Sequence, residues 1–190
     1  SLTQYAYDIE RAIPPSNQWG VNSVPQVVAY NLLYANIVSR VASIPSTALA
    51  LMTTLGQLEL ALRFADLRTR PEQRTKAYID IGNELLQQGN IAKCVELLAR
   101  AEIAAMQITY PGTRSCALSR IAQLLYQAGE KQSAQNTLSH ALDAIAHKEN
   151  NITDAVIAIA ETAIAINDSA VLRRLLPLSL IHISEPTRPY

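Results

Sequence analysis

The chain has 190 residues, with sixteen Lys and Arg against sixteen Asp and Glu, so its formal net charge is zero. Hydrophobic residues make up 49 %, which is enough to bury a core and excludes a wholly disordered chain. The balanced charge disfavours nucleic-acid binding, which usually leaves clusters of Lys and Arg. No segment reads as a convincing membrane span or signal peptide. We therefore expect neither nucleic acid nor membrane as a partner, and favour the cytoplasm, although a leader ahead of Ser1 is left open.

Residues 1–25 are interrupted by Pro, Gly, Asn and Ser. This composition predicts a short helix near residues 5–13 and then a Pro-rich loop. The apolar spacing over residues 27–42 predicts a longer helix. Pro45 then marks the start of another helix, because proline is tolerated in a first turn.

From there the chain repeats one pattern. In each segment an apolar residue is followed three positions later by Ile, and a small residue comes directly after that Ile. Gly or Asn stands eleven positions after the apolar residue. Gly and Asn adopt the left-handed conformation that closes a helix, so each segment predicts a helix, a tight turn and a second helix. Gly56 adds one earlier unit. The three full segments are Tyr78, Ile81, Gly82 and Gly89; Leu118, Ile121, Ala122 and Gly129; and Val156, Ile159, Ala160 and Asn167.

A linking phrase also recurs, with proline, arginine and alanine at intervals of three residues. Pro71 and Pro111 begin these phrases and predict helix starts. We expect Arg74 and Arg114, three residues later, to bond carbonyls of the preceding turn. Successive turn residues are 33, 40 and 38 positions apart, and we attribute the unequal spacing to insertions in the links.

At these residues the chain resembles the tetratricopeptide repeat family. The resemblance implies an all-α fold, a right-handed α-solenoid of antiparallel helical pairs with about three to four repeats, over residues 26–177. An ordinary irregular helical bundle remains the alternative. The residues that occupy the family's slots in the best unit are Tyr78, Ile81, Gly82, Leu85, Cys94 and Leu98, with Met106 where the family has Pro.

The last residues differ in character from the rest. Residues 178–188 read as the in-frame translation of a common transposon-type sequencing-library adapter. We therefore interpret residues 178–190 as a non-native read-through tail and expect the natural gene to continue differently beyond Pro177. No residue of this tail is assigned to a site.

In the family that the chain resembles, the first helix of each pair lines a concave groove that commonly receives peptides. Amide, arginine and tyrosine side chains there can bond a peptide backbone or carboxylate. The family's chaperone-tail clamp is not carried over, because Ile79 and Ser119 stand where it needs polar or basic residues. The partner-binding candidates are Lys76, Asn83, Arg120, Gln123, Tyr126 and Glu161; the other residues placed along the groove are Ile79, Leu86, Ser119, Asp154, Ile157 and Ile164.

The search for catalytic and metal chemistry gives weak candidates. His140, Asp143 and His147 share one helical face, but a solvated face explains them better than a zinc site. Cys116 stands at a helix start, where a depressed pKa would make it nucleophilic, and no histidine partners it locally. Cys94 is best explained as a buried packing thiol. We therefore expect no enzyme activity, no metal and no cofactor.

The sequence thus predicts a noncatalytic module that binds a protein or peptide in its groove. The alternative is a regulatory or sensing segment of a larger protein whose activity lies outside this chain. RNA binding is disfavoured because Asp154 and Glu161 would face the groove. Leu175 and Leu176 end the last unit without a complete partner helix, so self-association through this end is a further prediction.

Overall fold

The computed structural model describes residues 24–146 and 152–183, and the helix predicted near residues 5–13 lies outside them. The described backbone consists of helices joined by turns and short links, without a strand, which confirms the all-α expectation. The chain divides into two compact units, Ser1–Ser43 and Ile44–Tyr190. Helix α2 (Val24–Ser43) belongs to the first unit, where the sequence predicted a helix over residues 27–42.

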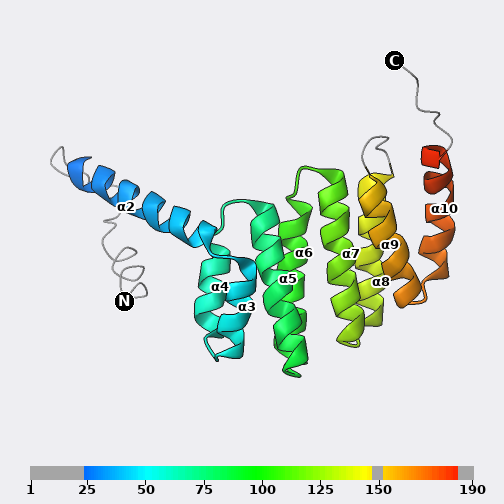
Figure 1. The fold of residues 1–190 in the computed structure, drawn as a ribbon, viewed down its shortest axis with the longest axis horizontal. Coiled ribbons are helices and arrows are strands. Elements are labelled where there is room, and N and C mark those ends of the chain that lie inside the picture. Colours follow the sequence, from blue (N-terminus) through cyan, green and yellow to red (C-terminus); the bar gives the residue numbers. More distant parts are fainter. Residues whose placement is uncertain (1–23, 147–151, 184–190) are drawn as a thin grey trace, which may run out of the picture. The chain divides into compact units, whose positions relative to one another are not determined.

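The second unit contains the other described helices, side by side in Figure 1. Within the described residues no single helix is long and apolar enough to cross a membrane, although the segments Asn31–Ser43 and Ser46–Thr54 pass that test as a bent pair. The helices of the second unit are α3 (Ser46–Thr54), α4 (Leu58–Asp66), α5 (Pro71–Gln87), α6 (Ile91–Met106), α7 (Pro111–Gln127), α8 (Lys131–Ile145), α9 (Thr153–Ala165) and α10 (Ser169–Ile183).

Four tight turns join α3 to α4, α5 to α6, α7 to α8 and α9 to α10, and each contains a predicted left-handed residue. Gly56, Gly89, Gly129 and Asn167 have φ of +76°, +74°, +93° and +57°. In each turn the next amide donates to a carbonyl five residues back, as from Asn90 N to Leu85 O at 2.8 Å. This Schellman arrangement satisfies carbonyls that the helix end would leave unpaired. The turn prediction is therefore confirmed.

The unequal spacing of the turns has only in part the predicted cause. The links after α4 and α6 have the same length, residues 67–70 and 107–110. Helix α4 has 9 residues whereas α6 has 16, while α5 and α7 both have 17. The difference between the first two spacings therefore lies in the second helix of the pair and not in the link, contrary to the prediction. The link between α8 and α9, residues 146–152, is longer than the other two, as an insertion there predicts.

The first helices of the pairs form one layer, in which α3 packs on α5, α5 on α7 and α7 on α9. Equivalent positions in the second helices, five residues after each of the first three turns, hold small side chains that are fully buried: Ala61, Cys94 and Ala134. A β-carbon built on Gly82 of α5 would lie 3.3 Å from Leu98 Cδ2 of α6. Small residues therefore let the two layers approach closely, and the expected packing role of Cys94 is confirmed.

The second helices are joined by ion pairs. Arg100 of α6 bonds Asp66 of α4, and Arg174 of α10 bonds Asp143 of α8, at 2.6 and 2.7 Å. His140 of α8 lies 3.1 Å from Glu102 of α6 and bears charge only when protonated. These groups are largely solvent-exposed, so each pair contributes at most about 1 kcal/mol. The pairs therefore link neighbouring second helices without dominating stability.

The end of the second unit differs from expectation at one residue. Leu175 is buried in the same core as α8 and α9, because α10 packs on both helices. Leu176 beside it is 60 % exposed. The helical backbone continues through Pro177 into the predicted tail as far as Ile183. Leu175 is therefore covered, contrary to the expectation that this apolar pair lacks a partner helix.

Candidate functional site

The six predicted partner-binding residues lie on the first helices of three successive pairs. Helix α5 carries Lys76 and Asn83, α7 carries Arg120, Gln123 and Tyr126, and α9 carries Glu161. All six side chains are exposed or partly exposed.

Equivalent positions on these helices are counted back from the residue that closes each turn. Asn83, Gln123 and Glu161 each precede it by six residues, and Leu86, Tyr126 and Ile164 by three. Because α5 packs on α7 and α7 on α9, equivalent positions lie in rows across the layer. These six residues form a polar row beside an apolar row. Together with Arg120 of α7, which bonds Gln123, we call them the first-helix face.

Two further observations bear on this face. Burial and then the charge of Asp154 raise the pKa of Cys116, although Asp154 is on α9 and Cys116 on α7. Both residues stand thirteen positions before their turn residue, so equivalent positions on adjacent first helices are near neighbours. Arg120 donates to Gln123 Oε1 at 2.5 Å, which holds the Gln123 amide on this face.

The structure corrects two of the residues predicted to line the groove. Ile79 and Ser119 stand ten positions before their turns and are only 9 % and 1 % exposed. They are buried because α5 and α7 each have a further first helix packed beside them. The equivalent Ile157 of α9 is 50 % exposed, and among the described helices no first helix follows α9.

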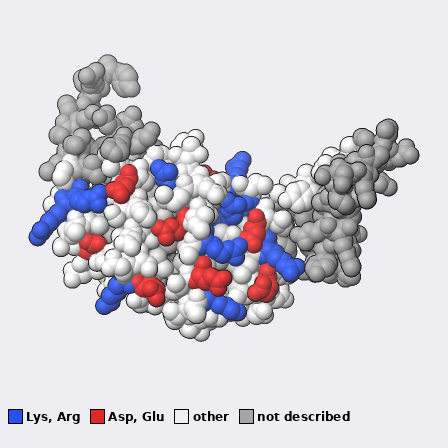
Figure 2. Space-filling view, turned by 180° about the vertical axis from the view of Figure 1, so that it is seen from behind, with Lys and Arg blue, Asp and Glu red and all other residues white. Residues whose placement is uncertain are grey.

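The charges on the surface are mixed in sign. On the face drawn in Figure 2, acidic and basic side chains alternate with uncharged ones over the second unit. Along the first helices, Lys76 and Arg120 are exposed on α5 and α7, and Asp154 and Glu161 on α9. The most exposed charged residues are therefore basic on α5 and α7 and acidic on α9, while α5 also carries the partly exposed Glu72 and Glu84.

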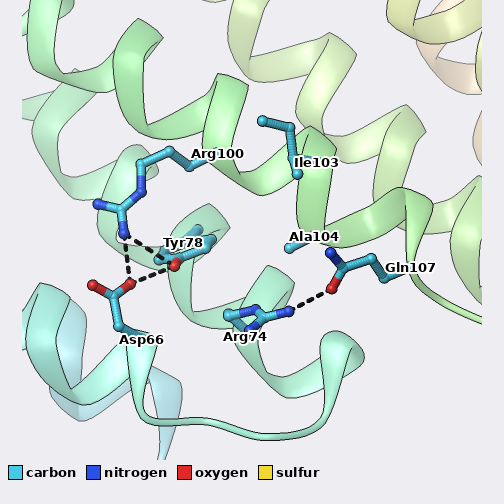
Figure 3. Close-up of a pocket in the computed structure, with 7 residues that line it drawn as sticks. All are labelled: Asp66, Arg74, Tyr78, Arg100, Ile103, Ala104 and Gln107. Carbon is cyan, nitrogen blue, oxygen red and sulfur yellow. Dashed lines mark hydrogen bonds and ion pairs between the residues drawn. The ribbon is translucent and has the colours of Figure 1, made fainter. Parts of the chain in front are cut away.

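A hollow that the sequence did not predict lies between α4, α5 and α6. Its volume is about 380 Å³. Figure 3 shows two arginine side chains on opposite sides of Tyr78. The lining residues are Asp66, Arg74, Tyr78, Arg100, Ile103, Ala104 and Gln107.

One side of the hollow is a hydrogen-bonded trio. Asp66 Oδ1 accepts from the Tyr78 hydroxyl and, at 2.6 Å, from Arg100 Nη2. Arg100 Nη2 also donates to the Tyr78 oxygen at 3.2 Å, and its guanidinium lies 5.0 Å from the centre of the Tyr78 ring. A cation over an aromatic face is attracted by the ring's quadrupole. Arg100 is therefore held by a carboxylate, a hydroxyl and a ring.

The other side is formed by Arg74, which donates from Nη2 to Gln107 Oε1 at 2.6 Å. This bond crosses from the start of α5 to the link after α6. The Arg74 side chain therefore bonds a side-chain amide, and the expectation that it bonds a carbonyl of the preceding turn is wrong.

The environment of Tyr78 changes the acidity of its hydroxyl. Burial, the hydrogen bond to Asp66 and the charge of Asp66 together raise the pKa of Tyr78 to about 12. Burial is the largest cause, because the phenolate would be formed away from water. Tyr78 therefore remains a neutral hydrogen-bond donor well above physiological pH.

This shift predicts an alkaline loss of stability. A group whose folded-state pKa exceeds its unfolded value of about 10 stabilises the fold below that pH, and this contribution is lost as pH rises toward about 12. We expect stability to fall between about pH 9 and pH 11, and to fall less in Tyr78→Phe. Urea unfolding of both proteins at the two pH values measures this difference. Tyr110→Phe is the control, since Tyr110 is 72 % exposed. Equal losses in wild type and Tyr78→Phe would contradict the assignment.

The other chemical candidates are separated by the structure. His140 faces Glu102 on α6, whereas Asp143 faces Arg174 on α10, and His147 lies outside the described residues. Within the described ranges no group of three His, Cys, Asp or Glu side chains is placed to hold a metal.

Burial and then Asp154 raise the pKa of Cys116, which is the opposite of the depressed value considered from its place near a helix start. The Cys116 thiol is therefore a poor nucleophile at neutral pH.

Sequence reasoning placed Tyr78 correctly as a packing residue but missed the hollow beside it. Asp66 and Arg100 are 34 residues apart, and no local pattern pairs them. The recurring position of Arg74 in the linking phrase was the one available signal.

Comparison with known proteins adds no relative, since no family model, no curated protein and no solved structure matches the chain.

Proposed function

We propose that this chain is a noncatalytic interaction module that binds an extended segment of a protein partner across the first helices α5, α7 and α9. The observation that carries the proposal is the pair of rows on the first-helix face, one polar and one apolar, repeated at the same register in three helices. An extended peptide presents backbone groups and side chains at regular intervals, so a surface with regular rows can match it.

The proposal includes the architecture. We infer that α3–α10 form four antiparallel pairs stacked as a solenoid similar to tetratricopeptide repeats. Four identical turns and the continuous packing of the first helices support this arrangement. Stacked repeats share their core with their neighbours and leave an extended face free for binding.

The side chains on the first-helix face suit this task chemically. The amides of Asn83 and Gln123 can each donate to and accept from a peptide backbone. Tyr126 offers a large contact area at a low cost in conformational entropy, and Ile164, 67 % exposed, extends the apolar row. The exposed Arg120 on the central helix α7 and the exposed Glu161 on α9 favour a segment with an acidic residue over α7 and a basic residue over α9.

The test begins with a peptide selected from a random-sequence display library on the immobilised protein. We expect the combined change of Asn83, Arg120, Gln123 and Tyr126 to alanine to weaken its binding at least about tenfold, since aromatic and arginine contacts dominate such interfaces. Fluorescence anisotropy with the labelled peptide measures the dissociation constant.

A matched control changes the same residue types on other surfaces. The control variant changes four exposed residues instead. Asn136 and Gln132 of α8 match the two amides, Lys131 of α8 matches the arginine, and Tyr110 in the link before α7 matches the tyrosine. Their combined change to alanine is expected to leave peptide affinity within about twofold of wild type. If both quadruple variants bind the peptide as wild type does, the first-helix face is not the binding surface.

A further inference from the structure

The hollow between α4, α5 and α6 is not used by the proposed function, because none of its lining residues belongs to the first-helix face. Its charged side chains are two guanidinium groups and one carboxylate. The carboxylate, Asp66, is already bonded to Arg100 and Tyr78. Because the charges of Asp66 and Arg100 offset each other, the lining has one net positive charge, which is that of Arg74.

Arg74 is prepared to bind an anion. No described carboxylate lies within ion-pair distance of it, and its Nη2 is held by the neutral amide of Gln107. A guanidinium has five N–H donors in a fixed planar fork, so the bond to Gln107 orients the group while leaving further donors. A carboxylate accepts such donors in pairs through charge-assisted hydrogen bonds.

Arg100, which lies across Tyr78 from Arg74 in Figure 3, is likewise held by hydrogen bonds, in its case to Asp66 and Tyr78. Both guanidinium groups are thus positioned before any ligand arrives, which reduces the entropy lost on binding. Tyr78, as a neutral hydroxyl, adds no negative charge that would repel an anion.

The remaining wall is apolar. Ile103 is 66 % exposed although it lies beside charged groups, and Ala104 continues this wall. A wholly polar anion such as inorganic phosphate would leave Ile103 uncovered. An acid with an aliphatic portion would cover it, and removing that apolar surface from water is favourable.

We propose that this hollow binds an organic carboxylate carried on an aliphatic chain, with Arg74 as its principal charge partner and Ile103 as its apolar contact. Two sources supply this chemistry: a free aliphatic acid and the C-terminal residue of a peptide. Both place one carboxylate next to a short hydrocarbon group.

The test uses N-acetyl-leucine as the probe and follows binding by NMR chemical-shift titration of the full chain. A dissociation constant on the order of 1 mM is expected for so small a ligand. Arg74→Gln should weaken binding at least about tenfold, because a charge-assisted pair is lost. Arg74→Lys should weaken it less, since the charge remains without the planar fork.

The matched control is Arg114→Gln, which removes the arginine at the equivalent position of the next linking phrase, outside the hollow. Its binding of N-acetyl-leucine should equal that of wild type. The quadruple variant of the first-helix face should also bind normally, so failure of the peptide proposal and failure of this proposal are distinguishable. A thermal melt of each variant shows whether it is folded.

Further ligands complete the test. N-acetyl-leucinamide, which lacks the carboxylate, should bind at least about tenfold more weakly than the acid. Hexanoate binding as tightly as N-acetyl-leucine assigns the hollow to free acids, whereas tighter binding of a pentapeptide ending in leucine assigns it to a chain terminus. The proposal is overturned if the amide binds as well as the acid, if phosphate binds more tightly than both acids, or if folded Arg74→Gln binds like wild type.

Discussion

Replacement of Leu98 by alanine is expected to lower the free energy of unfolding by about 3 kcal/mol, the largest single effect that the structure predicts. The Leu98 side chain is fully buried, and it packs against the α5 backbone at Gly82. The change removes hydrocarbon from the core and leaves a cavity that the closely packed layers cannot fill. Since small domains are stable by only about 5–15 kcal/mol, the loss should be evident in equilibrium urea unfolding.

The control for this prediction is Ile103→Ala on the same helix. Ile103 is 66 % exposed, so its truncation should change stability by no more than about 0.5 kcal/mol. A similar loss in the two variants would show that Leu98 does not join the two layers as the structure indicates.

Replacement of Gly129 by valine is expected to cost about 2 kcal/mol or more in unfolding free energy. Gly129 has φ of +93°, which a β-branched residue adopts only under strain. Nothing lies within 4 Å of the place where its β-carbon would stand, so the cost is conformational rather than a clash. Urea unfolding of the variant measures this cost.

The chain supplies its own comparison for this turn. Asn167 occupies the equivalent position in the last pair, with φ of +57° and the same hydrogen-bond pattern. Gly129→Asn should therefore cost less than about 1 kcal/mol, because asparagine tolerates the left-handed region. Equal losses for valine and asparagine at position 129 would mean that backbone conformation is not the cause.

Local hydrogen bonding and helical periodicity made the helices and turns predictable from the sequence. The residues Gly56, Gly89, Gly129 and Asn167 close their helices as the spacing indicated, because a left-handed closing residue is a local requirement of one short segment. Pro71 and Pro111 begin α5 and α7 because the first turn of a helix needs no amide donor at that position, which is also a local requirement. The burial of Cys94 followed from its place five residues after a turn.

Features that depend on neighbouring helices were decided only by the tertiary structure. Ile79 and Ser119 have the helical spacing of an open face, yet the next first helix in the layer buries them. The raised pKa of Cys116 depends on desolvation and on Asp154 of another helix.

The hollow arises in the same way, because it requires the end of α4, the start of α5 and the end of α6 to meet. The sequence by itself determined the helices, their turns and the small residues between them, since these rest on contacts within one pair of helices. The tertiary structure alone decided which polar side chains face one another. Asp66 of α4 meets Arg100 of α6 only when successive pairs are stacked, and Arg74 meets Gln107, 33 residues along the chain, only when α5 and α6 pack together.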